Sequence, residues 1–122
     1  MKSLRQWQSE IADWGERTFN HDVRSGSLRG CIAHLKKEVD ELEESTKGGG
    51  LSNDSGTECA DIFILLCSIC RLQNVDLLKF VEWKMGVNRK RIWGLPDKDG
   101  VVEHKNLDDI LPKATKEDAN NE

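Results

Sequence analysis

The stretch CIAHLKKEVDELEES, residues 31–45, carries the clearest helical pattern in this chain of 122 residues. One apolar stripe begins just before it and continues through it, formed by Leu28, Ile32, Leu35, Val39 and Leu42. This spacing follows the 3.6-residue repeat of an α-helix with one apolar side. Three glycines at positions 48–50 predict the end of the helix, because glycine loses the most backbone entropy when it becomes helical.

Two more helices are predicted on either side of this one. The N-terminal segment carries an apolar stripe formed by Leu4, Trp7, Ile11 and Trp14, and it should end before Phe19. The segment from about Thr57 to Leu72 is apolar on every side between residues 62 and 69. A helix of that kind is typical of the centre of a bundle.

A fourth helix is predicted to follow a cap at Asn74 or Asp76 and to run to about Trp93, before Gly94 and Pro96. The alternation that marks strands is missing throughout, so the expected fold class is all-α. Four helices joined by short loops predict one small bundle. So small a core favours association of copies of the chain through their helices.

The composition excludes several classes of function. A formal net charge of -4 gives no positive field for a nucleic-acid backbone, so nucleic acid is not an expected partner. The first residues form no apolar leader, and the longest apolar run, residues 62–67, is far shorter than the roughly 18 residues of a membrane span. We therefore expect a cytoplasmic protein that binds no membrane. The polar tail, residues 105–122, should be loosely attached or disordered.

The four cysteines are expected to be reduced, buried thiols, because nothing marks the chain for secretion. Cys67 and Cys70 form a C-x-x-C motif in an apolar run. A structural zinc site normally needs four such ligands, and no second pair is present. The motif therefore favours core packing over metal binding or redox chemistry.

Two pairs of carboxylates are the first candidates for chemistry: Glu38 with Glu41, and Glu58 with Asp61. Their i, i+3 spacing places both members of a pair on one helix face, so two neighbouring helices can direct four carboxylates to one point. Such carboxylates repel one another unless a cation lies among them, and oxygen ligands favour Mg²⁺ or Mn²⁺. Water and a substrate phosphate can complete such a site, which suits hydrolysis of a phosphate chain. The competing interpretation is ordinary acidic helix surface, with Ser55-x-x-Glu58 as a capping box.

Cationic and aromatic residues supply further candidates for binding. Lys84, Asn88 and Arg91 share one stripe of the fourth predicted helix and can hold phosphates, although a solvated basic helix end is an alternative. His34 lies one turn before Glu38 and can reach a phosphate or a carboxylate, but a single histidine there is more often structural. Trp7 and Trp14 are expected to pack in the core, and one of them could also form the wall of a base pocket.

These motifs resemble those of a known family. Glu38-x-x-Glu41, Glu58-x-x-Asp61 and Lys84-x-x-x-Asn88-x-x-Arg91-x-Trp93 together resemble the MazG-like all-α nucleoside triphosphate pyrophosphohydrolases. More narrowly, the segments TFNHD, CIAHLKKEVDELEES, ECADIFILL and KMGVNRKRIWGLPDKDGVVEH are similar to the MazZ-type dATP/dGTP diphosphohydrolases, which bacteriophages often carry. The likeness covers about residues 5–104. It implies a MazG-like domain over residues 1–104, followed by the tail.

The resemblance implies a four-helix protomer that forms homodimers or homotetramers and needs Mg²⁺ or Mn²⁺. The metal ligands and catalytic residues carried over are Glu38, Glu41, Glu58 and Asp61. Lys84, Asn88 and Arg91 would contact the phosphates of a nucleotide substrate, with Trp93 supporting the fold. The implied reaction is attack of metal-activated water on dATP or dGTP, which releases the monophosphate and pyrophosphate. Glu41 is the candidate acceptor of the proton from that water.

Two other interpretations stay open. The same chemistry could act on another nucleotide, such as dCTP, dUTP or one with a damaged base, because no motif marks the base pocket. The chain could instead be a catalytically silent bundle whose cationic stripe binds a partner protein. A di-iron carboxylate bundle is disfavoured, because its Glu-x-x-His pairs are absent from the sequence.

Overall fold

The computed structural model describes residues 1–19, 26–47 and 53–105. It contains four helices, α1 (Leu4–Phe19), α2 (Leu28–Thr46), α3 (Asn53–Leu72) and α4 (Leu77–Lys90). The described residues form no strand, only an isolated β-bridge between Trp93 and His104. The all-α prediction is therefore confirmed. None of the helices in these ranges is both long enough and apolar enough to cross a bilayer.

The chain divides into two compact units, Met1–Phe80 and Val81–Glu122, which are described separately. The first unit holds α1, α2, α3 and the start of α4, and the second holds the rest of α4 and the segment after it. The predicted single domain over residues 1–104 stays a prediction. The three-glycine segment and the tail after residue 105 lie outside the described residues.

Most helix ends lie close to the predicted positions. Ser27 caps α2, since its hydroxyl accepts a hydrogen bond from the backbone N–H of Gly30 at 3.0 Å. The end of α2 at Thr46 agrees with the predicted stop. Asp76 caps α4, as one of the two predicted caps, because its Oδ1 accepts a hydrogen bond from Lys79 N at 3.3 Å.

Three helix ends differ from the prediction. α3 begins at Asn53, four residues before Thr57, so Ser55 lies inside the helix and the capping-box interpretation of Ser55-x-x-Glu58 is wrong. α4 ends at Lys90, three residues before Trp93, and α1 includes Phe19. Boundaries of this kind depend on local backbone hydrogen bonds, which apolar spacing does not encode.

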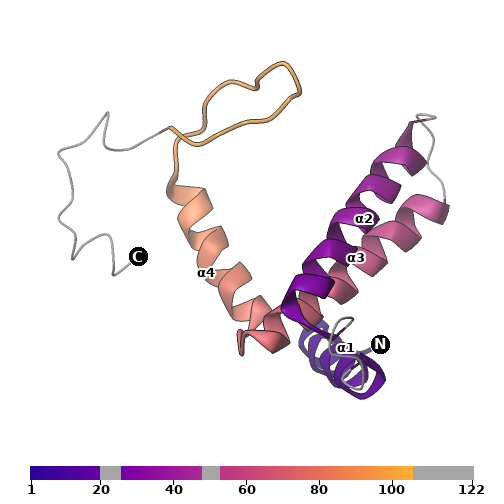
Figure 1. Cartoon of the computed structure of the whole chain (residues 1–122). Coiled ribbons are helices and arrows are strands. Elements are labelled where there is room, and N and C mark those ends of the chain that lie inside the picture. The colour runs from indigo at the N-terminus through magenta and orange to yellow at the C-terminus, as the bar shows by residue number, and fades with distance from the viewer. Residues whose placement is uncertain (20–25, 48–52, 106–122) are drawn as a thin grey trace. The chain divides into compact units, whose positions relative to one another are not determined.

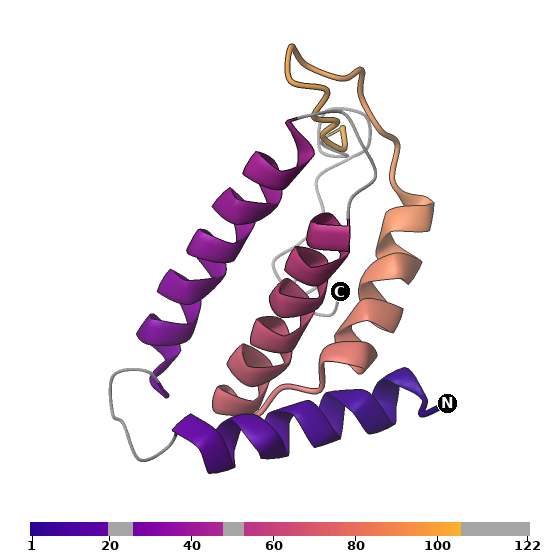
Figure 2. The same cartoon turned by 90° about the vertical axis from the view of Figure 1, so that its right-hand side faces the viewer.

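In the first unit α3 packs against both α1 and α2, and Figures 1 and 2 show α2 and α3 side by side with α1 across one end of α3. The predicted central position of α3 is confirmed within this unit. Cys67 of α3 is only 1% exposed, and Ile69 is also buried. Gly15 of α1 allows close approach, because a Cβ there would lie 3.0 Å from Ser68 Oγ of α3.

The predicted apolar stripes are only partly buried: Ile11, Leu35 and Leu42 are half-buried, and the other stripe residues are exposed. α1 buries Ala12 and Gly15, whereas the predicted core residues Leu4, Trp7 and Trp14 are 63%, 41% and 45% exposed. The physical reason is the packing distance: small residues let the backbone of α1 approach α3, so the larger side chains lie to the sides.

The same correction applies to α2. Its buried residues are Cys31 and Glu38, while Leu28, Ile32 and Val39 of the apolar stripe are all exposed. The face of α2 with a thiol and a carboxylate is therefore the one that contacts α3. This arrangement leaves an apolar surface on the single chain, which we call the α2 apolar face (Leu28, Ile32 and Val39).

Polar contacts fix the ends of the helices in the first unit. Arg71 Nη1 of α3 lies 2.9 Å from Asp13 Oδ1 and 3.3 Å from Glu16 Oε2 of α1. Arg5 of α1 pairs with Asp76 at 2.7 Å. α1 is therefore tied both to the end of α3 and to the cap of α4.

In the second unit a turn follows α4. The Oδ1 atom of Asp97 accepts hydrogen bonds from the backbone N–H groups of Asp99 and Val101, both at 2.9 Å. Gly100 has a φ of +81°, a conformation that favours glycine. The segment is therefore a turn that Asp97 Oδ1 stabilises through hydrogen bonds within the turn.

All four cysteines are free. Cys31 and Cys67 are buried, Cys70 is half-buried, and Cys59 is exposed, so the expectation of buried thiols is wrong for Cys59. Burial raises the pKa of Cys67 to about 11, which keeps that thiol protonated near neutral pH.

Candidate metal centre and pocket

Three carboxylates from two helices meet in the first unit. Glu38 comes from α2, Glu58 and Asp61 come from α3, and one oxygen of each lies within 4.8 Å of the others. Near the connected ends of these helices, Ser45 Oγ lies 3.2 Å from Ser55 Oγ. α2 and α3 therefore run antiparallel, and this brings the i, i+3 pair of α3 opposite the middle of α2. We call these three residues the acidic cluster.

Two oxygens of the acidic cluster lack a donor. Glu38 is only 9% exposed, and its Oε1 lies 3.1 Å from His34 Nε2. The other oxygen of Glu38 and Oε2 of Glu58 are buried and have no hydrogen-bond partner within the described ranges. A buried carboxylate oxygen costs free energy unless a donor or a cation compensates it. The cluster therefore fits a cation, and an all-oxygen ligand set suits a hard divalent ion.

The pKa values of two of these carboxyl groups move in opposite directions. The hydrogen bond with Glu38 is the main cause that raises the pKa of Glu58 to about 7, and burial adds to it. The same hydrogen bond is the main cause that lowers the pKa of Glu38. Two carboxyl groups can share a hydrogen bond only when one of them is protonated. Without a cation, the pair therefore shares a proton below neutral pH, whereas the fully ionised pair lacks a donor.

Glu41 lies at the solvent edge of the acidic cluster. It is exposed, and it is not among the three residues whose oxygens meet within 4.8 Å in the part of the chain that the structure describes. Its hydrogen bond lowers the pKa of Glu38, and its charge raises the pKa of Glu58. The structure thus brings three of the predicted carboxylates together with the fourth beside them. A metal site of all four stays a prediction.

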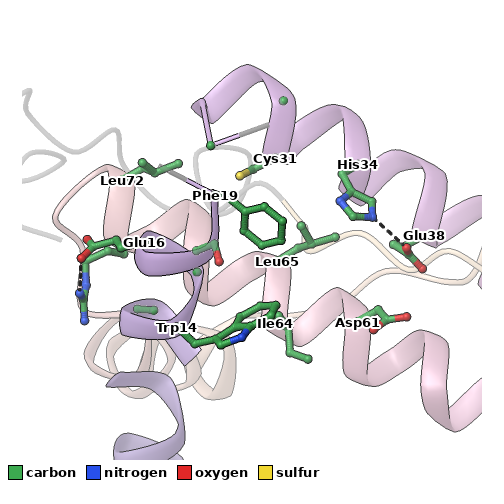
Figure 3. Close-up of a pocket in the computed structure, with 16 residues that line it drawn as sticks. Trp14, Glu16, Phe19, Cys31, His34, Glu38, Asp61, Ile64, Leu65 and Leu72 are labelled. Atoms are coloured by element: carbon green, nitrogen blue, oxygen red, sulfur yellow. Dashed lines mark hydrogen bonds and ion pairs between the residues drawn. The ribbon is translucent and has the colours of Figure 1, made fainter. Parts of the chain in front are cut away.

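His34 lies between the acidic cluster and solvent. Its side chain is 58% exposed, and its contact with Glu38 is the i, i+4 contact of neighbouring helix turns. This contact fixes one oxygen of Glu38 and leaves the other free to face α3 (Figure 3). The predicted contact of His34 with a nucleotide phosphate stays untested.

The predicted phosphate-binding residues belong to the second unit. Lys84 and Asn88 lie on α4, and Arg91 follows the last residue of that helix. Lys84 is exposed, while Oδ1 of Asn88 is buried without a partner among the described residues. Trp93 Nε1 donates to the backbone carbonyl of Asn88 at 3.3 Å, which agrees with a role of Trp93 in the fold.

A pocket of about 360 Å³ extends from the acidic cluster through the first unit. Glu38, Asp61 and His34 line one end, the Glu16–Arg71 ion pair lies at the opposite end, and mainly apolar side chains line the stretch between them (Figure 3). Figure 3 shows Phe19 and Leu65 between this acidic end and the opposite end of the pocket. The pocket can therefore accept a ligand with a charged group at the carboxylate end and an apolar part beside Phe19 and Leu65.

Several pocket residues were not predicted as site residues. Leu65, Ser68 and Leu72 follow Asp61 at i+4, i+7 and i+11, which is the helical spacing of one face of α3. That spacing could have revealed them once Asp61 was placed in the site. Trp14, one of the two candidates for a pocket wall, does line the pocket.

Comparison with known proteins gives two informative similarities, although no protein-family model matches the chain. A dATP/dGTP diphosphohydrolase of Salmonella phage PMBT28 is 34% identical over 97 residues, which are 80% of this chain. The chain spans about 30% of the length of that relative. The matched segment is therefore one part of a longer protein.

The second similarity is to a solved structure. It is the MazG-like pyrophosphohydrolase of cyanophage S-2L, bound to dGDP and to three catalytic Mn²⁺ ions per active site. The TM-score is 0.65 at 28% identity, and the likeness covers 86% of this chain and 95% of that one. This chain therefore has the MazG-like all-α fold, and its resemblance to the MazG-like nucleoside triphosphate pyrophosphohydrolases is confirmed.

Proposed function

We propose that this protein hydrolyses the purine deoxynucleoside triphosphates dATP and dGTP to the monophosphate and pyrophosphate. The observation that carries the proposal is the acidic cluster, with two buried oxygens that lack donors, at one end of the pocket. The phage relative supports the purine substrates by its name, and the cyanophage structure supports the metal by its bound Mn²⁺.

The acidic cluster is the proposed metal site, with Glu41 as an additional ligand. When bound there, Mg²⁺ or Mn²⁺ would activate the attacking water and neutralise charge on the phosphate chain. The protein holds Glu38 through His34, which directs its second oxygen into the cluster. Glu41 is exposed beside the cluster and is the proposed acceptor of the proton from the attacking water.

Contacts with the phosphates are proposed for Lys84, Asn88 and Arg91, with a further contact from His34. A guanidinium and an ammonium group both complement phosphate oxygens, and the guanidinium can bind two of them. Asn88 Oδ1 accepts no hydrogen bond within the described ranges, so no protein donor holds the side-chain amide through that atom. We expect Lys84→Ala chiefly to raise KM, because a uniform phosphate contact acts in both the ground state and the transition state.

We further propose that the protein is a homodimer or homotetramer. The α2 apolar face leaves Ile32 39% exposed and Val39 47% exposed, and apolar side chains grouped in this way favour an interface. Sedimentation velocity should give a mass of two or four chains. Ile32→Glu should reduce that mass, whereas the control Lys37→Glu, at an exposed position on another face of α2, should not.

The function is tested by incubating the purified protein with each common dNTP and NTP, with Mg²⁺, with Mn²⁺ and with EDTA. Metal-dependent release of dGMP and dAMP with pyrophosphate is the expected result, measured by chromatography. Glu58→Gln should abolish this turnover and retain the helical circular dichroism, while the exposed control Glu43→Gln should keep it. Turnover of pyrimidine nucleotides alone would contradict the purine assignment, and no turnover of any nucleotide would favour the silent bundle.

A further inference from the structure

The lining of the pocket changes from charged to apolar with distance from the acidic cluster. The carboxylates and His34 lie at one end, and Phe19 with the aliphatic residues of α3 forms a large part of the remainder (Figure 3). Trp14 also lines the pocket, and its ring lies edge to face with Phe19, with ring centroids 5.5 Å apart. Aromatic and aliphatic surfaces of this kind favour the flat face of a nucleobase. Such packing does not depend on which base is bound.

The spacing along α3 fits one nucleotide. A helix rises about 1.5 Å per residue, so Ser68 lies about 10 Å along the axis from Asp61, with Leu65 about midway. This separation is of the order of the length of a deoxynucleoside. If the phosphate chain lies at the acidic cluster, the base therefore lies near Leu65 and Ser68.

Ser68 supplies a polar group in an otherwise apolar stretch of α3. It is half-buried and lines the pocket, and its hydroxyl has no hydrogen-bond partner among the residues that the structure describes. Polar groups within a folded protein usually have a partner, so the free hydroxyl suits a ligand. A hydroxyl can rotate to donate or to accept, and can therefore bond with either the amino group of adenine or the carbonyl of guanine.

Gly15 faces the same hydroxyl from α1. A Cβ at this position would lie 3.0 Å from Ser68 Oγ, too close without a shift of one of the two residues. The absence of a side chain at Gly15 thus lets α1 lie beside Ser68 without crowding its hydroxyl, and both residues line the pocket.

We propose that Ser68, kept accessible by Gly15, is the residue that hydrogen-bonds the purine edge and sets the base preference of the site. This inference rests on the proposed hydrolysis of dNTPs. The base lies between the apolar wall of α3 and the aromatic residues of α1. The Ser68 hydroxyl selects for purines because the polar edge of a purine reaches it, whereas the edge of the smaller pyrimidine ring does not.

Ser68→Ala is the decisive variant, because it removes the hydroxyl and adds no bulk. It should lower kcat/KM for dATP and dGTP by about three- to tenfold, the loss of one net hydrogen bond, and leave the values for dCTP and dTTP unchanged. The matched control is Ser9→Ala, the same change at an exposed position of α1, which should alter neither set.

A second readout is independent of catalysis. Saturation-transfer NMR can measure the binding of deoxyadenosine and deoxyguanosine in EDTA. Their affinity should fall by the same factor in Ser68→Ala. Gly15→Ala should weaken nucleoside binding further. If crowding against the hydroxyl prevents the Gly15→Ala variant from folding, the double variant with Gly15→Ala and Ser68→Ala tests the same point.

The outcomes separate this inference from the proposed function. If the wild-type protein cleaves purine dNTPs and a well-folded Ser68→Ala variant keeps both the purine preference and the nucleoside affinity, the assignment of Ser68 is overturned and the function stands. If no dNTP is cleaved, the proposed function fails. Metal-free binding of purine nucleosides that depends on Ser68 would then still support the base subsite.

Discussion

The raised pKa of Glu58 predicts that binding of a divalent cation to the acidic cluster displaces a proton. With a pKa of about 7, Glu58 is about nine-tenths protonated at pH 6 and about one-tenth protonated at pH 8. A metal ligand must be deprotonated, so the apparent affinity for Mn²⁺ should rise about tenfold between these pH values. Glu38, whose pKa is lowered by the same hydrogen bond, should contribute little to this change.

The assay is isothermal titration calorimetry of Mn²⁺ in two buffers of different ionisation enthalpy. We expect release of about 0.9 proton at pH 6 and about 0.1 proton at pH 8, from the same protonated fractions. His34→Asn should preserve the proton release, because it removes the neighbouring imidazole and keeps Glu58, whereas Glu58→Gln should abolish it. Equal affinity at both pH values, with no proton released at pH 6, would refute this reasoning.

The stability of the metal-free protein should change in the corresponding direction. The folded-state pKa of Glu58 lies above its ordinary value of 4.5, so the folded state binds the proton more tightly than the unfolded state does. The stabilising contribution of this group is therefore fully present below about pH 4.5 and is lost as the pH rises through about 7. Saturating Mn²⁺ should restore part of the stability at pH 8, measured as Tm.

Three further results are expected from residues outside the acidic cluster. Arg5 lowers the pKa of Asp76 to about 2, so Asp76→Asn should lower Tm at pH 7, and this deficit should shrink as the pH falls from about 3.8 through 2, followed by circular dichroism. Arg71→Met should cost less than about 1 kcal/mol in urea unfolding, because its ion pairs with α1 are partly exposed; a loss of several kcal/mol would contradict this. Iodoacetamide at pH 8 should label exposed Cys59 and spare buried Cys67, whose thiol has a pKa of about 11, until denaturant is added; mass spectrometry of the native protein identifies the labelled site.

The residue pattern was sufficient to predict the helices and the meeting of two acidic motifs. The apolar repeat and the glycines after α2 fixed where helix was possible, since these preferences act within a few turns. The i, i+3 spacing placed Glu58 and Asp61 on one face of α3, and this face does meet Glu38 in the structure. Local geometry decides the helices and the common face of Glu58 and Asp61, whereas the contact of that face with Glu38 depends on how α2 packs against α3.

Which face each helix buries was decided only by tertiary packing. The repeat in α2 places Ile32 and Val39 on one apolar side, but it does not determine which helix, if any, packs against that side. In the single chain Glu38 contacts α3, while Ile32 and Val39 stay exposed and Leu35 and Leu42 of the same stripe are only half-buried. Burial of a carboxylate is favourable only with specific partners, which come from another helix.

The pocket and the shifted pKa values likewise required the three-dimensional structure. Gly15 and Ser68 are 53 positions apart in sequence, and only the approach of α1 to α3 brings a backbone without a side chain against that hydroxyl. The pKa of Glu58 depends on its distance from Glu38 and on burial, two quantities that spacing along one helix does not contain. Sequence thus determined the chemical groups and their local order, and tertiary structure decided which of them share a site, because contacts between helices depend on packing across the whole unit.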